Sequence, residues 1–270
     1  MSSPFDFSGK HVFVAGGTSG INFGIAEGFA RAGAKLTVLS RSQEKVDAAV
    51  AQLRKLGSGA IGFSADVREY AAIESAFKSA RAEFGEIDVL ISGAAGNFPA
   101  PALGMSPNGF KAVVDIDLIG TYHVMRAAFP YLKKPGASII NITAPQSEQP
   151  THFQIHVCAA KAGVDMVTRV LAMEWGPVGV RVNAISPGPI DDTEGMRRLA
   201  PNEKARQIVT ESVPLMRFGQ AQDIAHAALF LSSAYAGYIN GAILAVDGGW
   251  SLAGTGSLGL ALPKALAEKG

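Results

Sequence analysis

Short β-branched segments alternate with longer amphipathic segments along almost the whole chain of 270 residues. Alternation at this spacing is typical of βαβ units, whose right-handed crossovers place the strands in one parallel sheet. Hydrophobic residues make up 48% of the chain and charged residues 17%, which suits strands that are buried on both faces. We therefore expect an α/β fold with a doubly wound, parallel, seven-stranded sheet, and not an antiparallel sandwich.

The positions of the strands and helices follow from this alternation. Strands are expected at 11–15, 35–40, 60–64, 89–92, 138–143, 181–186 and 243–246. Helices are expected at 21–31, 43–55, 70–84, 106–117, 122–132, 157–175 and 221–231. No linker, low-complexity tract or internal repeat interrupts the pattern, so residues 1–270 are expected to form a single domain.

Residues 188–214 interrupt the alternation of strands and helices, because they are rich in charge and follow the end of the sixth expected strand. Ligand crevices form at the carboxyl ends of parallel strands. This insert is therefore expected to be a lid over the substrate. The alternative is an ordinary surface excursion.

Charge and cysteine content argue against several classes of function. The net charge is +1 without a basic stripe, so no nucleic-acid partner is expected. The single cysteine, Cys158, excludes an internal disulfide and a multi-cysteine metal site. His152 and His156 are four residues apart but have no evident third ligand, so no metal is expected.

Targeting and membrane signals are also missing from the sequence. No segment approaches the roughly 20 apolar residues of a membrane span, and residues 1–10 lack the apolar core of a signal peptide. Residues 267–270 are not of the Ser-Lys-Leu type. We expect a cytoplasmic protein with no membrane partner.

A glycine-rich segment follows the first expected strand and opens the first helix. It reads Ala15-Gly16-Gly17-Thr18-Ser19-Gly20-Ile21-Asn22-Phe23-Gly24. Glycines there let the backbone approach a pyrophosphate, whose charge the free N–H groups at the helix start stabilise. The placement of this segment predicts a Rossmann-type dinucleotide site.

The residue after the second strand distinguishes the two nicotinamide cofactors. NAD enzymes usually place an acid there, whereas the 2′-phosphate of NADP requires a cation. Arg41 stands in that position without a carboxylate beside it, so NADPH (NADP+) is the expected cofactor. The alternative for Arg41 is a solvated charge at a helix start. Asp66, just past the third strand, either bonds the adenine amino group or caps the following helix.

The chain resembles short-chain dehydrogenases/reductases over nearly its whole length. Besides the glycine loop, the resemblance rests on Asp66-Val67, Gly93-Ala94-Ala95-Gly96, Asp117-Leu118-Ile119-Gly120-Thr121, Ile140-Asn141-Ile142-Thr143-Ala144, Ala160-Lys161-Ala162, Arg181-Val182-Asn183, Pro187-Gly188-Pro189-Ile190 and Asp247-Gly248-Gly249. It implies cofactor contacts from Gly16, Thr18, Ser19, Gly20, Ile21, Arg41, Asp66, Val67, Ala94, Ala95, Gly96, Lys161, Pro187, Gly188 and Ile190.

The sequence departs from that family at the loop and at the catalytic positions. Asn22 replaces a usual glycine, but asparagine tolerates unusual backbone angles better than most residues, so the loop is expected to persist. Of the family's usual Asn, Ser, Tyr and Lys, only the lysine is present, as Lys161. The tyrosine position is Val157, the serine position Ala144 and the asparagine position Asp117. Because valine cannot donate a proton, carbonyl reduction by the tyrosine route is not expected.

A narrower resemblance, to 2,4-dienoyl-CoA reductases of the peroxisomal type, accounts for these departures. It rests on Ala94-Ala95-Gly96-Asn97-Phe98, Asp115-Ile116-Asp117, Glu174-Trp175-Gly176-Pro177, Pro187-Gly188-Pro189-Ile190 and Thr193-Glu194-Gly195-Met196-Arg197-Arg198-Leu199. That branch also lacks the tyrosine and has aspartate at the asparagine position. The resemblance implies an NADPH-dependent reductase of a conjugated enoyl or dienoyl thioester in fatty acid metabolism. It also implies a homotetramer, for which the apolar residues 258–262 are expected to be buried against a neighbouring subunit.

The resemblance assigns catalytic roles to Lys161 and Asp117. Hydride addition to a dienoyl thioester builds negative charge on the thioester oxygen, and one proton must then reach carbon. Lys161 is expected to orient the nicotinamide ribose, and Asp117 to hold and polarise a water. The alternative for Asp117 is a helix-end or loop residue. Asp165, one helical turn after Lys161, is a possible ion-pair partner for it.

Substrate contacts are expected from Asn97 and Phe98, near the nicotinamide, and from Arg197, which would meet the phosphates of a CoA ester. The alternatives are a core position for Phe98 and a solvated helix face for Arg197. His156, next to the vacant tyrosine position, is the alternative proton donor.

Two other functions stay open at this point. One is a short-chain reductase or isomerase that acts on a carbonyl in a biosynthetic pathway, with His156 or Asp117 as the acid. The other is a catalytically silent NADP(H)-binding sensor, which the residues Val157, Ala144 and Asn22 would explain.

Overall fold

The computed structural model describes residues 5–255. Seven strands form one sheet in which every pairing is parallel, in the order β3-β2-β1-β4-β5-β6-β7. They are β1 (His11–Ala15), β2 (Lys35–Ser40), β3 (Ala60–Ser64), β4 (Val89–Ser92), β5 (Ser138–Ile142), β6 (Arg181–Pro187) and β7 (Ile243–Val246). The expected α/β fold with a seven-stranded parallel sheet is confirmed, and the strand bounds differ from the prediction by one residue at most.

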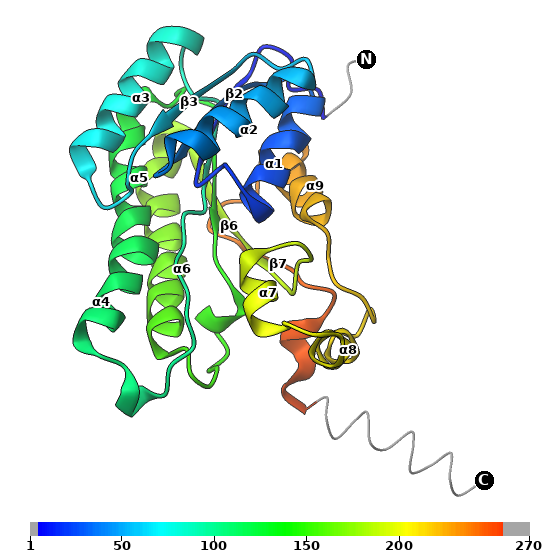
Figure 1. The fold of residues 1–270 in the computed structure, drawn as a ribbon. Coiled ribbons are helices and arrows are strands. Elements are labelled where there is room, and N and C mark those ends of the chain that lie inside the picture. Colours follow the sequence, from blue (N-terminus) through cyan, green and yellow to red (C-terminus); the bar gives the residue numbers. More distant parts are fainter. Residues whose placement is uncertain (1–4, 256–270) are drawn as a thin grey trace, which may run out of the picture.

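Helices cover both faces of this sheet (Figure 1). The α-helices are α1 (Gly20–Arg31), α2 (Gln43–Lys55), α3 (Tyr70–Phe84), α4 (Pro107–Val114), α5 (Gly120–Ala128), α6 (Ile155–Trp175), α7 (Glu194–Leu199), α8 (Glu203–Ser212) and α9 (Ala221–Ser232). Short helical turns are η1 (Ala102–Gly104), η2 (Asp115–Ile119), η3 (Phe129–Tyr131), η4 (Pro145–Ser147), η5 (Gly176–Val178), η6 (Ala234–Ala236) and η7 (Trp250–Thr255).

Two apolar cores lie on the two faces, because successive side chains of a strand point to opposite sides. Val12 and Val14 of β1 pack in a core with α1, α2 and α9. Phe13, between them, packs in a second core with α3, α5 and α6. In Figure 1 the helices of the second core stand to the left of the sheet, while α1 and α9 stand to the right. This two-sided burial explains the near-continuous apolar strands.

The expected helices 106–117 and 122–132 are wrong in their bounds. The chain runs from α4 through a π-helical turn, η2, directly into α5, without the break that was expected. At its end α5 stops at Ala128, and Pro130 lies in the 3₁₀ turn η3, because proline lacks the N–H group that a continuing helix requires. Asp117 therefore lies inside a helical turn, and its alternative as a helix-end or loop residue is wrong.

The insert at 188–214 contains the short helices α7 and α8, which lie together at the lower end of the molecule in Figure 1. Each begins with a side-chain cap: Thr193 Oγ1 accepts from Met196 N, and Asn202 Oδ1 accepts from Ala205 N. Its role as a lid stays a prediction. Residues 258–262, expected to contact a neighbouring subunit, lie outside the described part of the chain. Between residues 5 and 255, no helix is both long and apolar enough to span a membrane.

Candidate active site

The glycine loop leaves the backbone N–H groups at the start of α1 without side-chain partners. The N-cap residue Ser19 makes no side-chain cap hydrogen bond, and no acidic residue occupies the first turn. Gly16 has φ +80°, and a Cβ there would lie 2.9 Å from the backbone of Ala94. Only glycine fits at this position, and the free N–H groups suit an anion such as a pyrophosphate.

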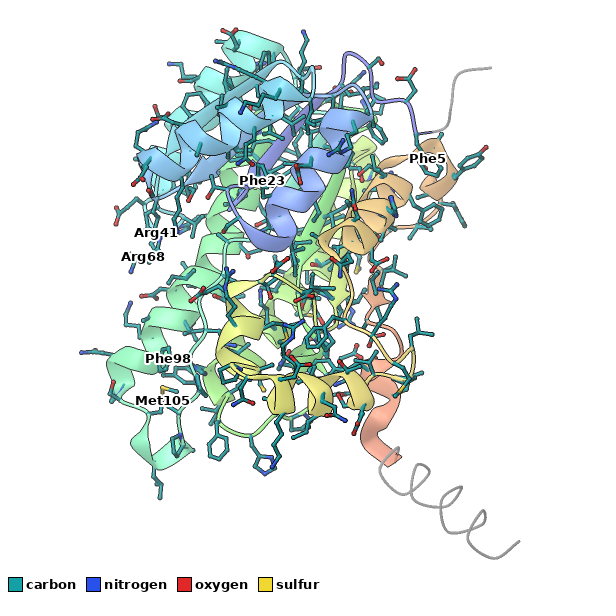
Figure 2. The ribbon with its side chains drawn as sticks, turned by 45° about the vertical axis from the view of Figure 1, so that its right-hand side comes forward. Phe5, Phe23, Arg41, Arg68, Phe98 and Met105 are labelled. Atoms are coloured by element: carbon teal, nitrogen blue, oxygen red, sulfur yellow. The ribbon has the colours of Figure 1, made fainter. Side chains whose placement is uncertain are left out.

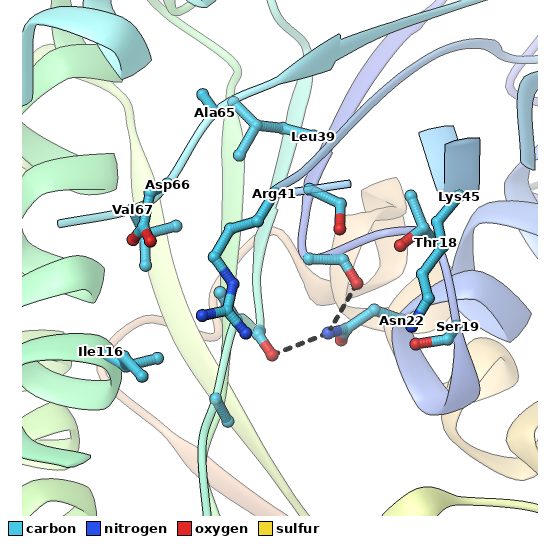
Figure 3. Close-up of a pocket in the computed structure, with 15 residues that line it drawn as sticks. Thr18, Ser19, Asn22, Leu39, Arg41, Lys45, Ala65, Asp66, Val67 and Ile116 are labelled. Atoms are coloured by element: carbon cyan, nitrogen blue, oxygen red, sulfur yellow. Dashed lines mark hydrogen bonds between the residues drawn. The ribbon is translucent and has the colours of Figure 1, made fainter. Parts of the chain in front are cut away.

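A cavity of about 260 Å³ lies beside this loop (Figure 3). Its walls come from the carboxyl ends of β1, β2 and β4 and from the segment after β3. The lining residues are Gly16, Thr18, Ser19, Asn22, Leu39, Ser40, Arg41, Lys45, Ala65, Asp66, Val67, Gly93, Ala94, Ala95 and Ile116. The structure thus brings together eight residues that the sequence assigned to the cofactor: Gly16, Thr18, Ser19, Arg41, Asp66, Val67, Ala94 and Ala95.

Two cationic side chains, Arg41 and Lys45, line this cavity. Lys45 of α2 lines it together with Arg41, and Arg41 and Arg68 lie on the same side of the molecule (Figure 2). Sequence reasoning missed Lys45, although its position one turn into the helix after Arg41 was a usable signal.

Asp66 is engaged with a neighbouring cation. Both of its carboxylate oxygens accept hydrogen bonds from the Arg68 guanidinium, at 3.0 and 2.6 Å, and this guanidinium lowers the pKa of the Asp66 carboxyl. The alternative of Asp66 as a helix cap is wrong, because the N-cap of α3 is Glu69.

Asn22 bridges the glycine loop and β4. Its amide nitrogen donates to Gly93 O at 2.7 Å and to Gly16 O at 3.4 Å (Figure 3). Asn22 lies within α1 and is not among the residues with positive φ. Asparagine is therefore accommodated at position 22 by its hydrogen bonds to two carbonyl groups, and not by a tolerance of unusual backbone angles.

A second cavity, of about 290 Å³, continues from the first, since both are lined by Asn22, Gly93 and Ala95. It is lined by Gly20, Ile21, Asn22, Gly93, Ala95, Gly96, Asn97, Asp117, Ile142, Thr143, Ala144, Gln146, Gln154, Val157, Lys161, Pro187, Gly188, Ile190, Thr193, Gly195 and Met196. Both residues expected to be catalytic are present, together with the remaining expected cofactor residues. Val157 and Ala144, which carry no hydroxyl group, line the same space.

Asp117 and Lys161 form a buried ion pair. The distance between Lys161 Nζ and Asp117 Oδ2 is 3.5 Å, and the side chains belong to residues that are 5% and 1% exposed. Gly96 N donates to Asp117 Oδ1 at 2.7 Å, and Lys161 Nζ donates to Ile142 O at 3.0 Å. Burial raises the pKa of the Asp117 carboxyl, while the Lys161 ammonium and the Gly96 N–H oppose that rise. Asp165 does not pair with Lys161, because neither of its carboxylate oxygens has a partner.

The π turn η2 places Asp117 at this cavity. A π turn holds one more residue per turn than an α-helix and is frequent at functional sites. Thr121 Oγ1 donates to the backbone oxygen of Asp117 at 2.6 Å, which satisfies a carbonyl within the widened turn. The aspartate therefore faces the cavity from the middle of a long helical segment, a position that periodicity alone does not reveal.

The structure places one of the three expected substrate residues in the second cavity and the other two outside it. Asn97 lines the second cavity, but Phe98 and Arg197 do not. Phe98 is 37% exposed, which makes its alternative as a core residue wrong, and its ring lies edge-on against that of His156, with 4.7 Å between the ring centroids. Arg197 is exposed and pairs with Glu194 at 3.4 Å, on a helix face open to solvent.

His156 is fully buried and does not line the cavity, and neither does any tyrosine of the described residues. No group of three His, Cys, Asp or Glu side chains within residues 5–255 is arranged to hold a metal ion. The charged side chains in the lining of the second cavity are therefore those of the ion pair, Asp117 and Lys161.

Comparison with known proteins agrees with this architecture. Residues 15–251 match the family model described as Enoyl-(Acyl carrier protein) reductase. A peroxisomal 2,4-dienoyl-CoA reductase of Arabidopsis thaliana is 43% identical over 262 residues, which cover 92% of this chain and 88% of the relative. A probable 2,4-dienoyl-CoA reductase of Bacillus subtilis is 40% identical over 243 residues, 89% of this chain and 96% of the relative.

Solved structures are also similar to this chain over most of its length. A short chain dehydrogenase from Bacillus anthracis has a TM-score of 0.83 at 37% identity and covers 91% of this chain and 97% of its own. A putative 2-deoxy-D-gluconate 3-dehydrogenase from Agrobacterium tumefaciens, solved with bound NADP, has a TM-score of 0.83 at 31% identity and covers 92% and 99%. This chain belongs to the short-chain dehydrogenase/reductase family of oxidoreductases.

Proposed function

We propose that this protein is an NADPH-dependent reductase of 2,4-dienoyl thioesters. The observation that carries the proposal is the buried Asp117–Lys161 pair in a cavity where the hydroxyl-bearing positions of the family are Val157 and Ala144. A site without a phenol suits the reduction of a conjugated carbon–carbon system better than that of a ketone. The names of the relatives from Arabidopsis thaliana and Bacillus subtilis support the same substrate class.

The first cavity fits NADPH. Free N–H groups at the start of α1 suit the pyrophosphate, and Arg41 and Lys45 suit the 2′-phosphate. A structural neighbour with bound NADP supports this choice. When bound, the cofactor supplies hydride to the far carbon of the conjugated system.

The residues of the chain would complete the reaction as follows. The ammonium group of Lys161 would donate to the nicotinamide ribose and keep Asp117 paired. Asp117 would hold a water that gives a proton to carbon once negative charge has built on the thioester oxygen, and the hydroxide left behind would take up a proton from solvent. The backbone N–H of Gly96 fixes the carboxylate that performs this step.

The first experiment is NADPH oxidation in the presence of a 2,4-dienoyl-CoA, compared with a 3-ketoacyl-CoA and with NADH as the reductant. Rapid oxidation with the dienoyl ester and NADPH alone is the expected result. Oxidation with the ketoacyl ester instead would favour the carbonyl reductase alternative. NADPH binding without turnover of either ester would favour the sensor alternative, which the absent hydroxyl groups of Val157 and Ala144 motivate.

The homotetramer and the cytoplasmic location stay predictions. The exposed apolar side chains of Met166, Val170 and Met173 on α6 support an oligomer. The location needs cell fractionation, since the names of several relatives include the word peroxisomal.

A further inference from the structure

If the proposed function is correct, the thioester oxygen needs a hydrogen-bond donor while it carries negative charge. In the family pattern, hydroxyl groups stand at the tyrosine and serine positions, but Val157 and Ala144 offer none. Most other polar side chains of the second cavity already have hydrogen-bond or ion-pair partners. Lys161 donates to Ile142 O and pairs with Asp117, whose carboxylate accepts from Gly96 N.

The other polar side chains that line the second cavity leave few candidates for the donor to the thioester oxygen. The Thr193 hydroxyl donates to Ile190 O at 2.8 Å, and the Asn22 amide donates to Gly93 O. The Thr143 hydroxyl oxygen is sealed from solvent, and Asn97 donates to Gln154. Two side-chain amides, Gln146 and Gln154, are left in the cavity.

Gln154 is held in one orientation. Its residue is 4% exposed, and its Oε1 accepts from Asn97 Nδ2 at 3.4 Å. With the oxygen of the amide directed at Asn97, the NH₂ group points elsewhere. Among residues 5–255, that NH₂ group makes no hydrogen bond.

The helix start directs this side chain at the cavity. Gln154 is the N-cap residue of α6, yet its side chain makes no capping bond. Gln154, Val157 and Lys161 are spaced i, i+3 and i+7, so they lie on one face of the helix. The amide therefore lies one turn away from the position that the tyrosine of the family occupies, along the same cavity wall.

The residue before Gln154 has a strained backbone conformation. The preceding residue, Phe153, has φ +65°, a left-handed conformation that is a genuine outlier for an aromatic residue. Its carbonyl oxygen accepts from Ala100 N at 2.9 Å, which ties this turn to the segment after β4. Such strain is found where surrounding structure holds a functional group in place.

The side chain of Gln146 is not held in place by neighbouring groups in this way. It is half-buried in the short turn η4, and no hydrogen bond from the described residues holds its side chain. An oxyanion donor is effective when it is fixed before charge develops. We infer that Gln154 Nε2 donates the hydrogen bond that stabilises the thioester oxygen during dienoyl reduction, with Asn97 as its positioning residue.

The kinetic test compares Gln154→Leu with wild type. Loss of one preorganised donor lowers kcat by about 100-fold, while the KM for dienoyl-CoA and the Kd for NADPH change little, because the bond strengthens in the transition state. Gln146→Leu, from the same cavity wall, is the matched control, and its kcat is expected to stay within about threefold of wild type. NADPH binding and thermal unfolding of Gln154→Leu verify that the variant is folded. Unchanged kcat in Gln154→Leu, or an equal loss in Gln146→Leu, overturns the inference.

A spectroscopic test needs no turnover. A hydrogen bond to the thioester oxygen polarises the conjugated system, so the ultraviolet absorption band of 2,4-dienoyl-CoA is expected to shift to longer wavelength in the complex with wild-type protein and NADP+. The shift is expected to disappear in Gln154→Leu and to persist in Gln146→Leu. A full shift in Gln154→Leu overturns the role of Gln154. A wild-type shift without any reduction of dienoyl-CoA by NADPH instead overturns the proposed function and leaves the hydrogen bond intact.

Discussion

At the scale of single residues, Asp117 can be tested against a neighbour on the same turn. Asp117→Ala is expected to lower kcat for dienoyl-CoA by about 100-fold or more and to leave NADPH binding largely intact, because Gly16, Arg41 and Lys45 line the first cavity, which Asp117 does not line. Asp115→Ala is the control, since Asp115 pairs with Lys111 on the surface of η2. Steady-state kinetics and cofactor titration measure both effects. A wild-type rate in Asp117→Ala would contradict the mechanism.

Burial of Asp117 also predicts a pH dependence of stability. A carboxyl whose pKa is raised in the folded state stabilises the fold fully below its ordinary pKa of about 4, and this contribution is lost as pH rises through the raised pKa. The free energy of unfolding of wild type, relative to Asp117→Asn, is therefore expected to fall as the pH rises above about 4. Urea unfolding at a series of pH values measures it. A rise instead would mean that attraction to Lys161 outweighs desolvation.

Arg41 and Lys45 are expected to select NADPH over NADH. Each charged contact with a phosphate contributes about 1.5–3 kcal/mol, so Arg41→Ala with Lys45→Ala is expected to raise the KM for NADPH by at least about tenfold. The KM for NADH, which lacks the 2′-phosphate, is expected to stay the same. Lys55→Ala, at the far end of α2, is the control. Equal losses with both cofactors would assign these cations a structural role.

At the scale of elements, α1 and α9 pack through small residues. A Cβ on Gly24 would lie 2.4 Å from Ala221 Cβ, so Gly24→Ala is expected to force the helices apart and destabilise the fold by about 1–3 kcal/mol. In Gly24→Ala with Ala221→Gly the methyl group is moved to the other helix, and most of that loss is expected to be recovered. Urea unfolding measures both variants. An unchanged free energy in Gly24→Ala would mean that this contact adapts freely.

The same scale explains which helices could be predicted. Helices α2 and α3 were predicted with their observed bounds, because each has a regular apolar stripe and a break on either side. The segment from α4 to α5 was not, because its π turn shifts the apolar phase without any proline or glycine between Gly109 and Gly120. A local pattern does not report such a turn, which is held by contacts to other elements.

At the scale of the whole molecule, exposed apolar side chains predict self-association. Met166, Val170 and Met173 lie on one face of α6, and Met173 is 80% exposed. Val170→Glu with Met173→Glu is expected to convert the predicted tetramer into a smaller species, since charge on that face opposes burial. Light scattering of wild type and variant measures the masses. A monomeric wild type would contradict the predicted tetramer.

The sequence by itself determined the fold class, the position of the phosphate loop and the pair Asp117 and Lys161 as candidates. These follow from patterns carried by neighbouring residues: apolar periodicity, glycines between a strand and a helix, and a family motif with three of its four catalytic positions substituted. The resemblance that they carry was confirmed by the family match.

Only the tertiary structure decided how distant residues meet. It brought Asp117 to 3.5 Å from Lys161, set Lys45 beside Arg41, gave Asn22 its two carbonyl partners and turned Gln154 into the cavity. It also separated Phe98 and Arg197 from that cavity. The physical reason is that periodicity specifies which face of an element is buried, whereas distances between side chains of different elements depend on how those elements pack.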